Sequence, residues 1–473
     1  MEMGATTEMV AESALDKYYW ASRYISELIQ GPPSPKPSAS AAEIRARALA
    51  RLDRLRQFLA FVGNPQQQYR SVHVGGTSGK GSTSALIASL LHAGGYHTGL
   101  HVSPYLQVET EKLQLDGRLM PAERFAEHVA ALDGEIKRWI AQGGPPLTYG
   151  EFWVALTFFS FAREALDWVV IEVGAGGRFD LTNVLLSDVA VITSIGLDHM
   201  RSLGSTIPEI AWHKAGIIKP GRPAVTTVTK PDALEVIARE AAETGSKLIH
   251  VLEGREFDVL STGAEGTRVL DRESGMTFAT VLPGHFQGAN VAAAAAAVRA
   301  VQNLLPRRID AALIARGIAE TRFAGRMEIV QRDPLVVLDG AHNPEKMESF
   351  LQGAADLGQP RRRILVLGSL DGHDYLAVAG IIAPIADEVI VTAPSAQERT
   401  SGSTEAIASV VRASGKPVEV IPEPLDAIDA ALRRAQADDH ILVTGSLYLV
   451  GAVRERWYQS EAIVLQGTCW PTA

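Results

Sequence analysis

The stretch VHVGGTSGKGST, residues 72–83, decides the fold, because a β-branched strand runs through glycines into a lysine, two hydroxyls and a helix-forming segment. Glycines let several backbone N–H groups converge on phosphate oxygens, and a helix N-terminus adds partial positive charge. Lys80 can reach outer phosphates and Ser82 can bind magnesium. The strict G-x-x-x-x-G-K-[ST] pattern is not met, since Val74 and Gly81 occupy two of its positions. We interpret the segment as a variant nucleotide-phosphate loop; a glycine-rich turn with Lys80 in solvent is the simpler alternative.

The regions on both sides of this loop predict an α/β protein. Short β-branched runs (168–173, 189–195, 223–228) alternate with Ala/Leu-rich amphipathic segments, which is typical of a parallel sheet with crossover helices. Residues 245–282 change to short strand-like pieces with turns and predict an antiparallel insert, after which 290–305 is helical again. Upstream, we expect a helix over 18–29, a Pro/Ser linker near 31–40 and a second helix over 41–61.

A fresh series of strand-like runs begins after residue 322: LVVLDG, RILVLG, EVIVTA, PVEVI and HILVTG. Each run is separated from the next by a helix-like segment, so a second, smaller α/β domain is expected. The predicted domains are therefore 1–322, including the N-terminal helices and linker, and 323–473.

Net charge, cysteine count and the distribution of apolar residues argue against several classes of function. The 473 residues carry a formal charge of −9, which argues against a nucleic-acid partner bound through bulk charge. The single cysteine, Cys469, allows neither an internal disulfide nor a thiolate metal cluster. The N-terminus lacks a secretory signal and no apolar run is long enough to span a bilayer, so we expect a cytoplasmic protein without a membrane partner.

Two further side chains stand at predicted strand ends, where ligands of open α/β sheets gather. Glu172 precedes the glycine-rich GAGGRFD segment and can hold magnesium, whereas a strand-end acid in a turn is the simpler reading. His199 follows the next strand, and a lone histidine is more often a polar surface or core residue than a ligand. Lys214, judged on spacing alone, is a solvated helix lysine.

Taken together and in order, the motifs PQ, GGTSGKGST, HVSPYL, LTYGEF, IEVGAGGRFDLTN, GLDHM, HKAGIIKPG, GHFQGAN, RFAGRME, LDGAHNP and TGSLYLVG cover most of the chain. This combination resembles the folylpolyglutamate synthase/dihydrofolate synthase family of the Mur ligase superfamily. The resemblance implies a P-loop ATPase domain with a parallel central sheet and a Rossmann-like C-terminal domain. It implies that ATP phosphorylates a pteroate or folate carboxylate, and that L-glutamate attacks the acyl phosphate to form an amide in folate biosynthesis and one-carbon metabolism.

The resemblance also implies roles for particular residues. The ATP contacts would be Thr77, Ser78, Gly79, Lys80, Gly81, Ser82, Asn290, Arg326 and Asp339. Two magnesium ions would be held by Ser82, Ser103, Glu172, His199 and Lys214, the last of them carbamylated. The catalytic residues would be Lys80, Lys214 and His342, with His342 near the incoming glutamate. The pteroate pocket would be lined by Thr148, Tyr149, Gly150, Glu151 and Phe179, whereas Phe152 and Trp153 are core residues in the simpler reading.

The chain departs from the family pattern at several of these motifs. Gly150 stands where the family commonly has an aromatic residue, and Leu181 replaces a small one. Ser78 replaces an asparagine, Ala175 a larger aliphatic residue, His213 a glutamate and Tyr105 a histidine. These departures fall on the predicted acceptor pocket, metal site and substrate loop.

Other functions remain open at this stage. A peptidoglycan-precursor ligase would need a separate UDP-sugar domain before the phosphate loop, for which too little chain is present. A Mur-type amide ligase acting on another carboxylate and a non-catalytic, ATP-binding regulatory homologue are the alternatives; a nucleic-acid-stimulated ATPase is disfavoured by charge. Dihydrofolate synthase, folylpolyglutamate synthase or both activities are compatible with the motifs, and we expect a monomer.

Overall fold

The computed structural model describes residues 13–30, 41–371, 374–394 and 400–472. The chain divides into two compact units. Unit 1 contains the described residues within Met1–Leu252, Ala292–Gly317 and Glu461–Ala473, and unit 2 those within Glu253–Val291 and Ile318–Ser460. The predicted linker near 31–40 lies outside the described residues, and the division into functional domains 1–322 and 323–473 stays a prediction.

Unit 1 is built on an eight-stranded sheet with the order β4-β3-β2-β5-β1-β6-β7-β8. The strands are β1 (Arg70–Gly75), β2 (Thr98–His101), β3 (Gln114–Leu115), β4 (Arg118–Leu119), β5 (Trp168–Glu172), β6 (Val189–Ile192), β7 (Ala224–Thr226) and β8 (Leu248–His250). The strands from β2 to β8 in this order pair in parallel, as the alternating pattern predicts. The short antiparallel hairpin β3–β4 at the edge was not predicted.

One prediction for this sheet was wrong. Residues 248–250 were assigned to the antiparallel insert, whereas β8 pairs in parallel with β7. The reason is that helix α9 (Pro231–Glu243) connects β7 to β8, and such a crossover returns the chain to the same end of the sheet.

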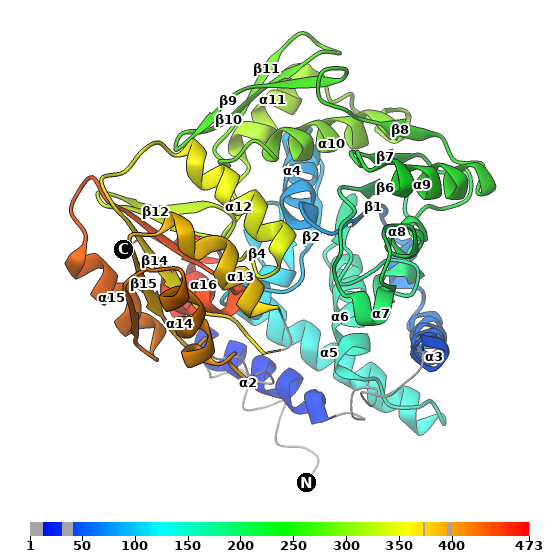
Figure 1. Ribbon diagram of the computed structural model, residues 1–473. Coiled ribbons are helices and arrows are strands. Elements are labelled where there is room, and N and C mark those ends of the chain that lie inside the picture. The colour runs from blue at the N-terminus through cyan, green and yellow to red at the C-terminus, as the bar shows by residue number, and fades with distance from the viewer. Residues whose placement is uncertain (1–12, 31–40, 372–373, 395–399, 473) are drawn as a thin grey trace. The chain divides into compact units, whose positions relative to one another are not determined.

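The helices that complete unit 1 include both predicted N-terminal helices. They are α2 (Ala14–Glu27), α3 (Ala41–Phe61), α4 (Lys80–Ala93), α5 (Ala122–Ala141), α6 (Tyr149–Arg163), α7 (Met200–Leu203) and α8 (Ile207–Ala215), with 3₁₀ turns η1 (Leu28–Gln30), η2 (Pro65–Gln67), η3 (Glu109–Lys112) and η4 (Leu181–Val184). Apolar side chains of α8 and α9 pack with those of β6 and β7 in one buried core, and both helices lie beside these strands in Figure 1.

The predicted insert is confirmed as a three-stranded antiparallel sheet in unit 2: β9 (Phe257–Gly263), β10 (Gly266–Asp271) and β11 (Thr277–Thr280). The predicted helix after it is α10 (Gln287–Ala300), followed by η5 (Gln302–Leu304) and α11 (Ala311–Glu320). The chain then passes into the second strand series.

That series forms a six-stranded sheet with the order β12-β13-β17-β14-β15-β16. All five predicted runs are strands: β13 (Leu335–Leu338), β14 (Arg363–Leu367), β15 (Glu388–Val391), β16 (Val418–Val420) and β17 (His440–Thr444), and they pair in parallel. The antiparallel edge strand β12 (Glu328–Arg332) was not predicted.

Helices cover this sheet. They are α12 (Pro344–Asp356), α13 (Tyr375–Ile382), η6 (Ala383–Ile385), α14 (Thr404–Ala413), α15 (Pro424–Arg434) and α16 (Leu447–Arg454), whereas the last helix, α17 (Ser460–Gln466), lies almost wholly in unit 1. Apolar residues of α12, α13 and α14 share one buried core with β13, β14, β15 and β17, so these helices cover one face, as Figure 1 shows. The α/β fold class with a second, smaller sheet domain is confirmed.

The end of the described chain returns to unit 1. Leu119 N in β4 donates to Gly467 O at 2.9 Å, and Arg118 Nη2 donates to Gln466 O at 2.7 Å. Within the described residues, no helix is both long and apolar enough to cross a membrane.

Candidate functional site

The carboxyl ends of four neighbouring strands in unit 1 bring the predicted site residues to one edge of the sheet. The strands β2, β5, β1 and β6 lie side by side and run in parallel, with Val74 paired to Glu172 and His101 to Ile171. Parallel strands end at the same edge of a sheet, and ligands of open α/β sheets bind there. Each of these strands therefore brings a predicted site residue or loop to this edge: Ser103 after β2, Glu172 at the end of β5, the loop 76–79 after β1 and His199 after β6.

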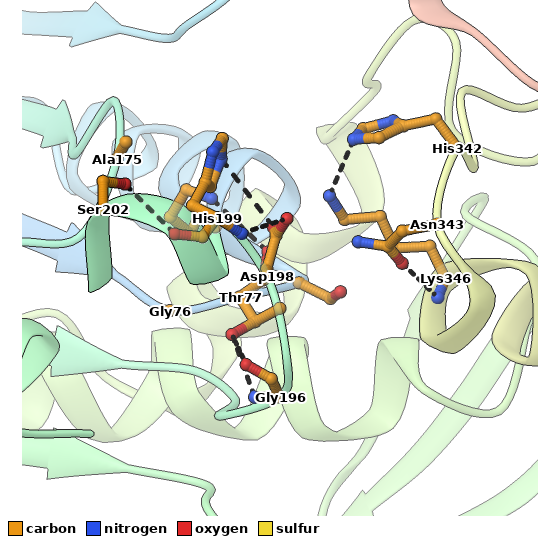
Figure 2. A network of polar contacts seen from close by, with 12 residues as sticks. Gly76, Thr77, Ala175, Gly196, Asp198, His199, Ser202, His342, Asn343 and Lys346 are labelled. Atoms are coloured by element: carbon orange, nitrogen blue, oxygen red, sulfur yellow. Dashed lines mark hydrogen bonds and ion pairs between the residues drawn. The ribbon is translucent and has the colours of Figure 1, made fainter. Parts of the chain in front are cut away.

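The loop 76–79 is anchored through its backbone carbonyls and through two N–H groups, since Thr77 N and Ser78 N donate to Ser194 O and Oγ at 2.8 and 2.9 Å. Lys214 Nζ donates to Gly76 O at 2.8 Å, and Lys80 Nζ lies 3.5 Å from Thr77 O. Thr193 Oγ1, just after β6, donates to Ser78 O at 2.6 Å. The Thr77 hydroxyl also accepts a hydrogen bond from Gly196 N at 3.0 Å, as Figure 2 shows. The segment after β6 thus holds the loop after β1.

A glycine is required at the start of this loop. Gly76 has φ of +145°, and a Cβ built there would lie 2.0 Å from Thr193 Oγ1. Gly79, with φ of +82°, makes the left-handed turn into α4. The glycines let the loop approach the segment after β6 and then turn into the helix.

The backbone N–H groups at the start of α4 are left for a ligand. The N–H groups of Lys80, Gly81 and Ser82 belong to the first turn of α4, and the helix ladder begins with Thr83 N donating to Gly79 O. Ser78 Oγ is buried and has no hydrogen-bond partner among the described residues. Free donors at a helix N-terminus beside a lysine form an anion site.

Ser103 and Glu172 are directly joined. Glu172 is buried, and its Oε2 accepts a hydrogen bond from Ser103 N at 3.1 Å. His199 lies at the same sheet edge, where its Nε2 is 3.9 Å from Asp198 Oδ2, a contact drawn in Figure 2. Among the described residues, no three His, Cys, Asp or Glu side chains gather as a protein-only metal centre.

Lys214 is not a solvated lysine. It is 2% exposed on α8, and its bond to Gly76 O ties α8 to the phosphate loop. Gly177 allows this packing from the other side, because a Cβ there would lie 2.8 Å from His213 O and 3.0 Å from Lys214 O. Burial, followed by the charges of Arg178, Arg45 and Lys214, lowers the pKa of His213, so this neighbourhood is electropositive.

The predicted acceptor residues lie at the start of α6 and before η4. Thr148 caps α6: its N and Oγ1 donate to Glu151 Oε2 at 2.7 and 2.6 Å, and the buried Glu151 also pairs with Arg54 at 2.8 Å. Tyr149 packs edge-on against Trp153, with ring centroids 6.4 Å apart. Thr148 and Glu151 are therefore bonded to each other at the start of α6. Their role in binding the acceptor stays a prediction.

Phe179 belongs to an aromatic group. Its ring lies 5.9 Å from that of Trp212 and 5.5 Å from that of His213, and the Arg45 guanidinium lies 5.0 Å from its centroid. An aromatic face with cations around it can accept a flat, electron-rich heterocycle by stacking.

In unit 2, the loop after β13 is organised by Asp339. Its carboxylate accepts hydrogen bonds from Met327 N at 2.9 Å and Ala341 N at 2.8 Å. Burial raises the pKa of Asp339, while the Arg326 charge and these bonds oppose the shift. Asn290, on α10, donates through Nδ2 to Gln287 Oε1 at 2.8 Å, and the Gln287 Nε2 is buried without a partner among the described residues.

His342 in the same loop has a defined tautomer. Its Nδ1 lies 2.8 Å from Gly340 O, and its Nε2 lies 3.1 Å from Lys346 Nζ, as drawn in Figure 2. A carbonyl only accepts and an ammonium only donates, so Nδ1 carries the proton and Nε2 accepts from Lys346. Asn343 caps α12 through its Oδ1, while its Nδ2 is buried without a partner among the described residues.

A second set of anchors, missed by sequence reasoning, holds the segment between β2 and β3. Glu111 accepts hydrogen bonds from the backbone N–H groups of Leu106, Gln107 and Val108 at 2.8, 2.8 and 3.0 Å. Glu109 accepts hydrogen bonds from the hydroxyls of Tyr18 and Ser22 on α2.

Sequence reasoning also missed Arg54, which pairs with Glu151, and Thr193 and Ser194, which hold the loop 76–79. It missed Lys346, which donates to His342, and Arg51, whose Nη2 lies beside Gly150. The contact between Thr148 and Glu151 had a local signal, because the T-x-x-E pattern is typical of a capped helix start. Since the other anchors join segments far apart in sequence, no local pattern could have indicated them.

Comparison with known proteins agrees with this geometry. Residues 74–298 match the Mur ligase middle domain, and residues 325–447 match the Mur ligase glutamate ligase domain. The folylpolyglutamate synthase of Lacticaseibacillus casei is 33% identical over 410 residues, which cover 85% of this chain and 93% of that protein. The dihydrofolate synthase/folylpolyglutamate synthase of Bacillus subtilis is 32% identical over 416 residues, covering 86% and 94%.

A solved structure is similarly close. The Mycobacterium tuberculosis folylpolyglutamate synthase, complexed with ADP and AMPPCP, superposes with a TM-score of 0.80 at 28% identity, covering 93% of this chain and 98% of that one. The chain therefore belongs to the folylpolyglutamate synthase/dihydrofolate synthase family of Mur ligases, which are ATP-dependent, ADP-forming glutamate ligases.

Proposed function

We propose that this chain binds ATP on the loop 76–82 and uses it to join L-glutamate to the carboxylate of a pteroate or folate. The observation that carries the proposal is the loop itself: Lys214, Lys80 and Thr193 hold its carbonyls, and the N–H groups of the first turn of α4 remain for phosphate. The relatives named above supply the substrate class, since their names refer to folates and one of them is solved with ADP and AMPPCP.

The phosphate contacts are assigned to Thr77, Ser78, Gly79, Lys80, Gly81 and Ser82. The first-turn N–H groups of α4 would bind phosphate oxygens, and the Lys80 ammonium would neutralise charge that develops during transfer. The buried, unpartnered Ser78 Oγ supports this assignment, because a phosphate oxygen would satisfy it.

The residues at the sheet edge fit magnesium. Magnesium prefers oxygen ligands and, in nucleotide sites, takes one or two carboxylates together with phosphates and water. Glu172 supplies the carboxylate, while Ser82 and Ser103 supply hydroxyls; His199 would join this set. When bound, magnesium would neutralise phosphate charge, and the predicted second ion stays part of the proposal.

Lys214 is assigned a second role through carbamylation. As an amine it is a buried cation on Gly76 O, and as a carbamate its nitrogen would retain one N–H for the same bond. The carbamate would add negative charge beside the loop, where a metal would offset it.

The remaining assignments concern residues in unit 2 and at the start of α6. Asn290, Arg326 and Asp339 are proposed ATP contacts, and His342, held with its Nε2 facing Lys346, is proposed to lie near glutamate. The acceptor would bind at Thr148, Tyr149, Gly150, Glu151 and Phe179, where an aromatic face is available for stacking.

The reaction balances as two transfers. A carboxylate oxygen of the acceptor attacks the γ-phosphorus of ATP, the bond to the bridging oxygen breaks, and ADP leaves. The glutamate amine then attacks the acyl carbon, an amide forms, phosphate leaves and the amine loses a proton. Water must be excluded between the two steps, because it would hydrolyse the acyl phosphate.

The test is release of ADP by the purified full-length chain with ATP, magnesium and glutamate, in the presence of dihydropteroate, tetrahydrofolate or no acceptor. Mass spectrometry should show a glutamate adduct on one or both acceptors. Lys80→Ala should reduce the rate at least about 100-fold, whereas exposed Lys247→Ala should not.

Nucleotide binding without an adduct on either acceptor would reject the folate assignment and favour a regulatory homologue or another carboxylate substrate. The expectations that the chain is monomeric and cytoplasmic stay predictions.

A further inference from the structure

At the start of α6, the guanidinium of Arg51 lies directly beside Gly150. A Cβ built on Gly150 would lie 2.8 Å from Arg51 Nη2 and 3.3 Å from Leu181 Cδ1. Arg51 belongs to α3, which packs against α6 and η4 within unit 1. The guanidinium therefore lies where a side chain at position 150 would begin.

Arg51 has an unused hydrogen-bond donor. Its Nε is buried and has no hydrogen-bond partner among the described residues, although the residue as a whole is partly exposed. Arg54, one turn later on the same helix, pairs with a carboxylate: its Nε and Nη2 both lie 2.8 Å from Glu151 Oε1. An unsatisfied buried donor costs free energy, so a ligand that brings an acceptor to Arg51 gains a bond without breaking one.

The surroundings favour a flat ligand with acceptor atoms on one edge. Phe179, just before η4, belongs to an aromatic group with Arg45 over its ring, and the carboxylate of Glu151, next to Gly150, is neutralised by Arg54. A guanidinium carries only donors, held in one plane, and it recognises two neighbouring acceptors in that plane, as arginine does at the O6/N7 edge of guanine.

The pterin ring presents such an edge in only one of two reduced states. In the 7,8-dihydro ring, O4 and the imine nitrogen N5 are both acceptors on the same edge. In the tetrahydro ring, N5 carries a hydrogen and is a donor, which faces the donors of a guanidinium unfavourably.

We propose that Arg51, in the space left by Gly150, makes the acceptor pocket selective for a 7,8-dihydropterin over a tetrahydropterin. This inference rests on the proposed function, because it takes the start of α6 and Phe179 as the acceptor pocket. It names dihydropteroate as the favoured acceptor class, and it assigns the discrimination to one side chain, that of Arg51 on α3.

The test measures dissociation constants of 7,8-dihydropteroate and tetrahydropteroate by calorimetry, with ADP and magnesium present. The full-length chain should bind the dihydro form about 10- to 100-fold more tightly, the discrimination expected of one bidentate arginine. In Arg51→Met, which retains the apolar stem but no donors, the ratio of the two constants should fall to about one. Arg47→Met removes an exposed charge from the same helix and should leave the ratio unchanged.

Two results would overturn the inference: equal binding of both rings by the unmodified chain, or a ratio that survives in Arg51→Met. If Arg51→Met fails to fold, Arg51→Lys decides, because it keeps the charge and loses the planar pair of donors. Failure of the proposed function is seen separately, as a lack of glutamate-dependent ADP release with either acceptor.

Discussion

Two loops at the same sheet edge of unit 1 are anchored differently. Side chains hold the loop after β1 on its carbonyl oxygens, which accept hydrogen bonds from Lys214, Lys80 and Thr193, while Ser194 accepts two of its N–H groups. The segment after β2 is held by its N–H groups, which donate to the carboxylate of Glu111. The first arrangement leaves the donors at the start of α4 for an anion, and the second uses its donors internally; in the same segment Ser103 N donates to Glu172.

The difference teaches that the anchor of a loop decides which polarity it offers to a ligand. Cations and hydroxyls on the carbonyls suit a phosphate loop, because they hold it without using the N–H groups of Lys80, Gly81 and Ser82 at the start of α4. A buried carboxylate suits a loop that must only be held in place, since it accepts several N–H groups at once. Four substitutions test this comparison.

Gly76→Ala should give the largest effect, because it breaks the carbonyl-anchored loop. The new Cβ would lie 2.0 Å from Thr193 Oγ1 at a φ of +145°. Strain and the displaced hydroxyl should lower the free energy of unfolding by about 4 kcal/mol and abolish ATP binding. Chemical denaturation and nucleotide titration measure both.

Gly134→Ala is the matched control, since nothing lies within 4 Å of that Cβ on the exposed side of α5. Alanine should stabilise this helix by about 0.5–1 kcal/mol. A Gly76→Ala protein that binds ATP normally would show that the loop tolerates the contact.

Glu111→Ala should break the N–H-anchored segment. It leaves the backbone donors of Leu106, Gln107 and Val108 without their acceptor, which should cost about 3 kcal/mol of unfolding free energy. Nucleotide affinity should change by less than about twofold, because the loop after β1 keeps its own anchors. Exposed Glu127→Ala serves as the control; equal losses in the two variants would remove any special role for Glu111.

Lys112 should make stability depend on pH. Its Nζ lies 3.9 Å from the Trp153 ring centroid, and burial lowers its pKa to about 7, against a smaller opposing effect of Glu109. Between pH 7 and 10 the unfolded chain binds a proton that the folded chain does not, so the free energy of unfolding rises with pH. From pH 7 to 9 the rise should be about 2 kcal/mol greater than in Lys112→Met.

The comparison needs urea denaturation at both pH values. Lys137→Met, at a lysine side chain that is 75% exposed, should keep the pH dependence of the original chain. A Lys112→Met protein with the same dependence would show that the buried lysine does not titrate in this window.

Tyr18→Phe should give the smallest effect. It removes the hydroxyl that donates to Glu109 and accepts from Glu109 N at 3.1 Å, while keeping the ring against Phe125. About 1 kcal/mol of unfolding free energy should be lost. Tyr19→Phe, whose hydroxyl reaches Glu461 at 3.1 Å on the surface, should lose less; the reverse order would mean that α2 does not hold this segment.

Much of the fold was predictable because its signals are local. The strand runs of both sheets, the helix over 41–61 and the antiparallel insert each follow from periodicity and turn residues. The error concerned strand pairing. The sequence pattern assigned residues 248–250 to the antiparallel insert, and only their parallel pairing with β7 shows that they belong to the sheet of unit 1. The hairpin β3–β4 and the edge strand β12 are short or bulged and carry little periodicity.

The candidate site divides in the same way. The loop 76–82, Glu172 and His199 could be found because strand ends and glycines mark them in the sequence. The anchors could not, because Thr193 and Lys214 reach the loop from more than a hundred residues away. Spacing alone gave Lys214 a solvated position, and only its partner, Gly76 O, shows why it is buried.

The return of residues 461–472 to unit 1 has a consequence for synthesis. All of unit 2 is synthesised before these residues. The hydrogen bonds of Leu119 and Arg118 in β4 to Gly467 and Gln466 can form only after the last residues of the chain have been made. During translation the unit that begins first is therefore completed last. A stalled chain ending near residue 460 would present a finished second unit and an uncapped first one, which is the species that a chaperone would meet.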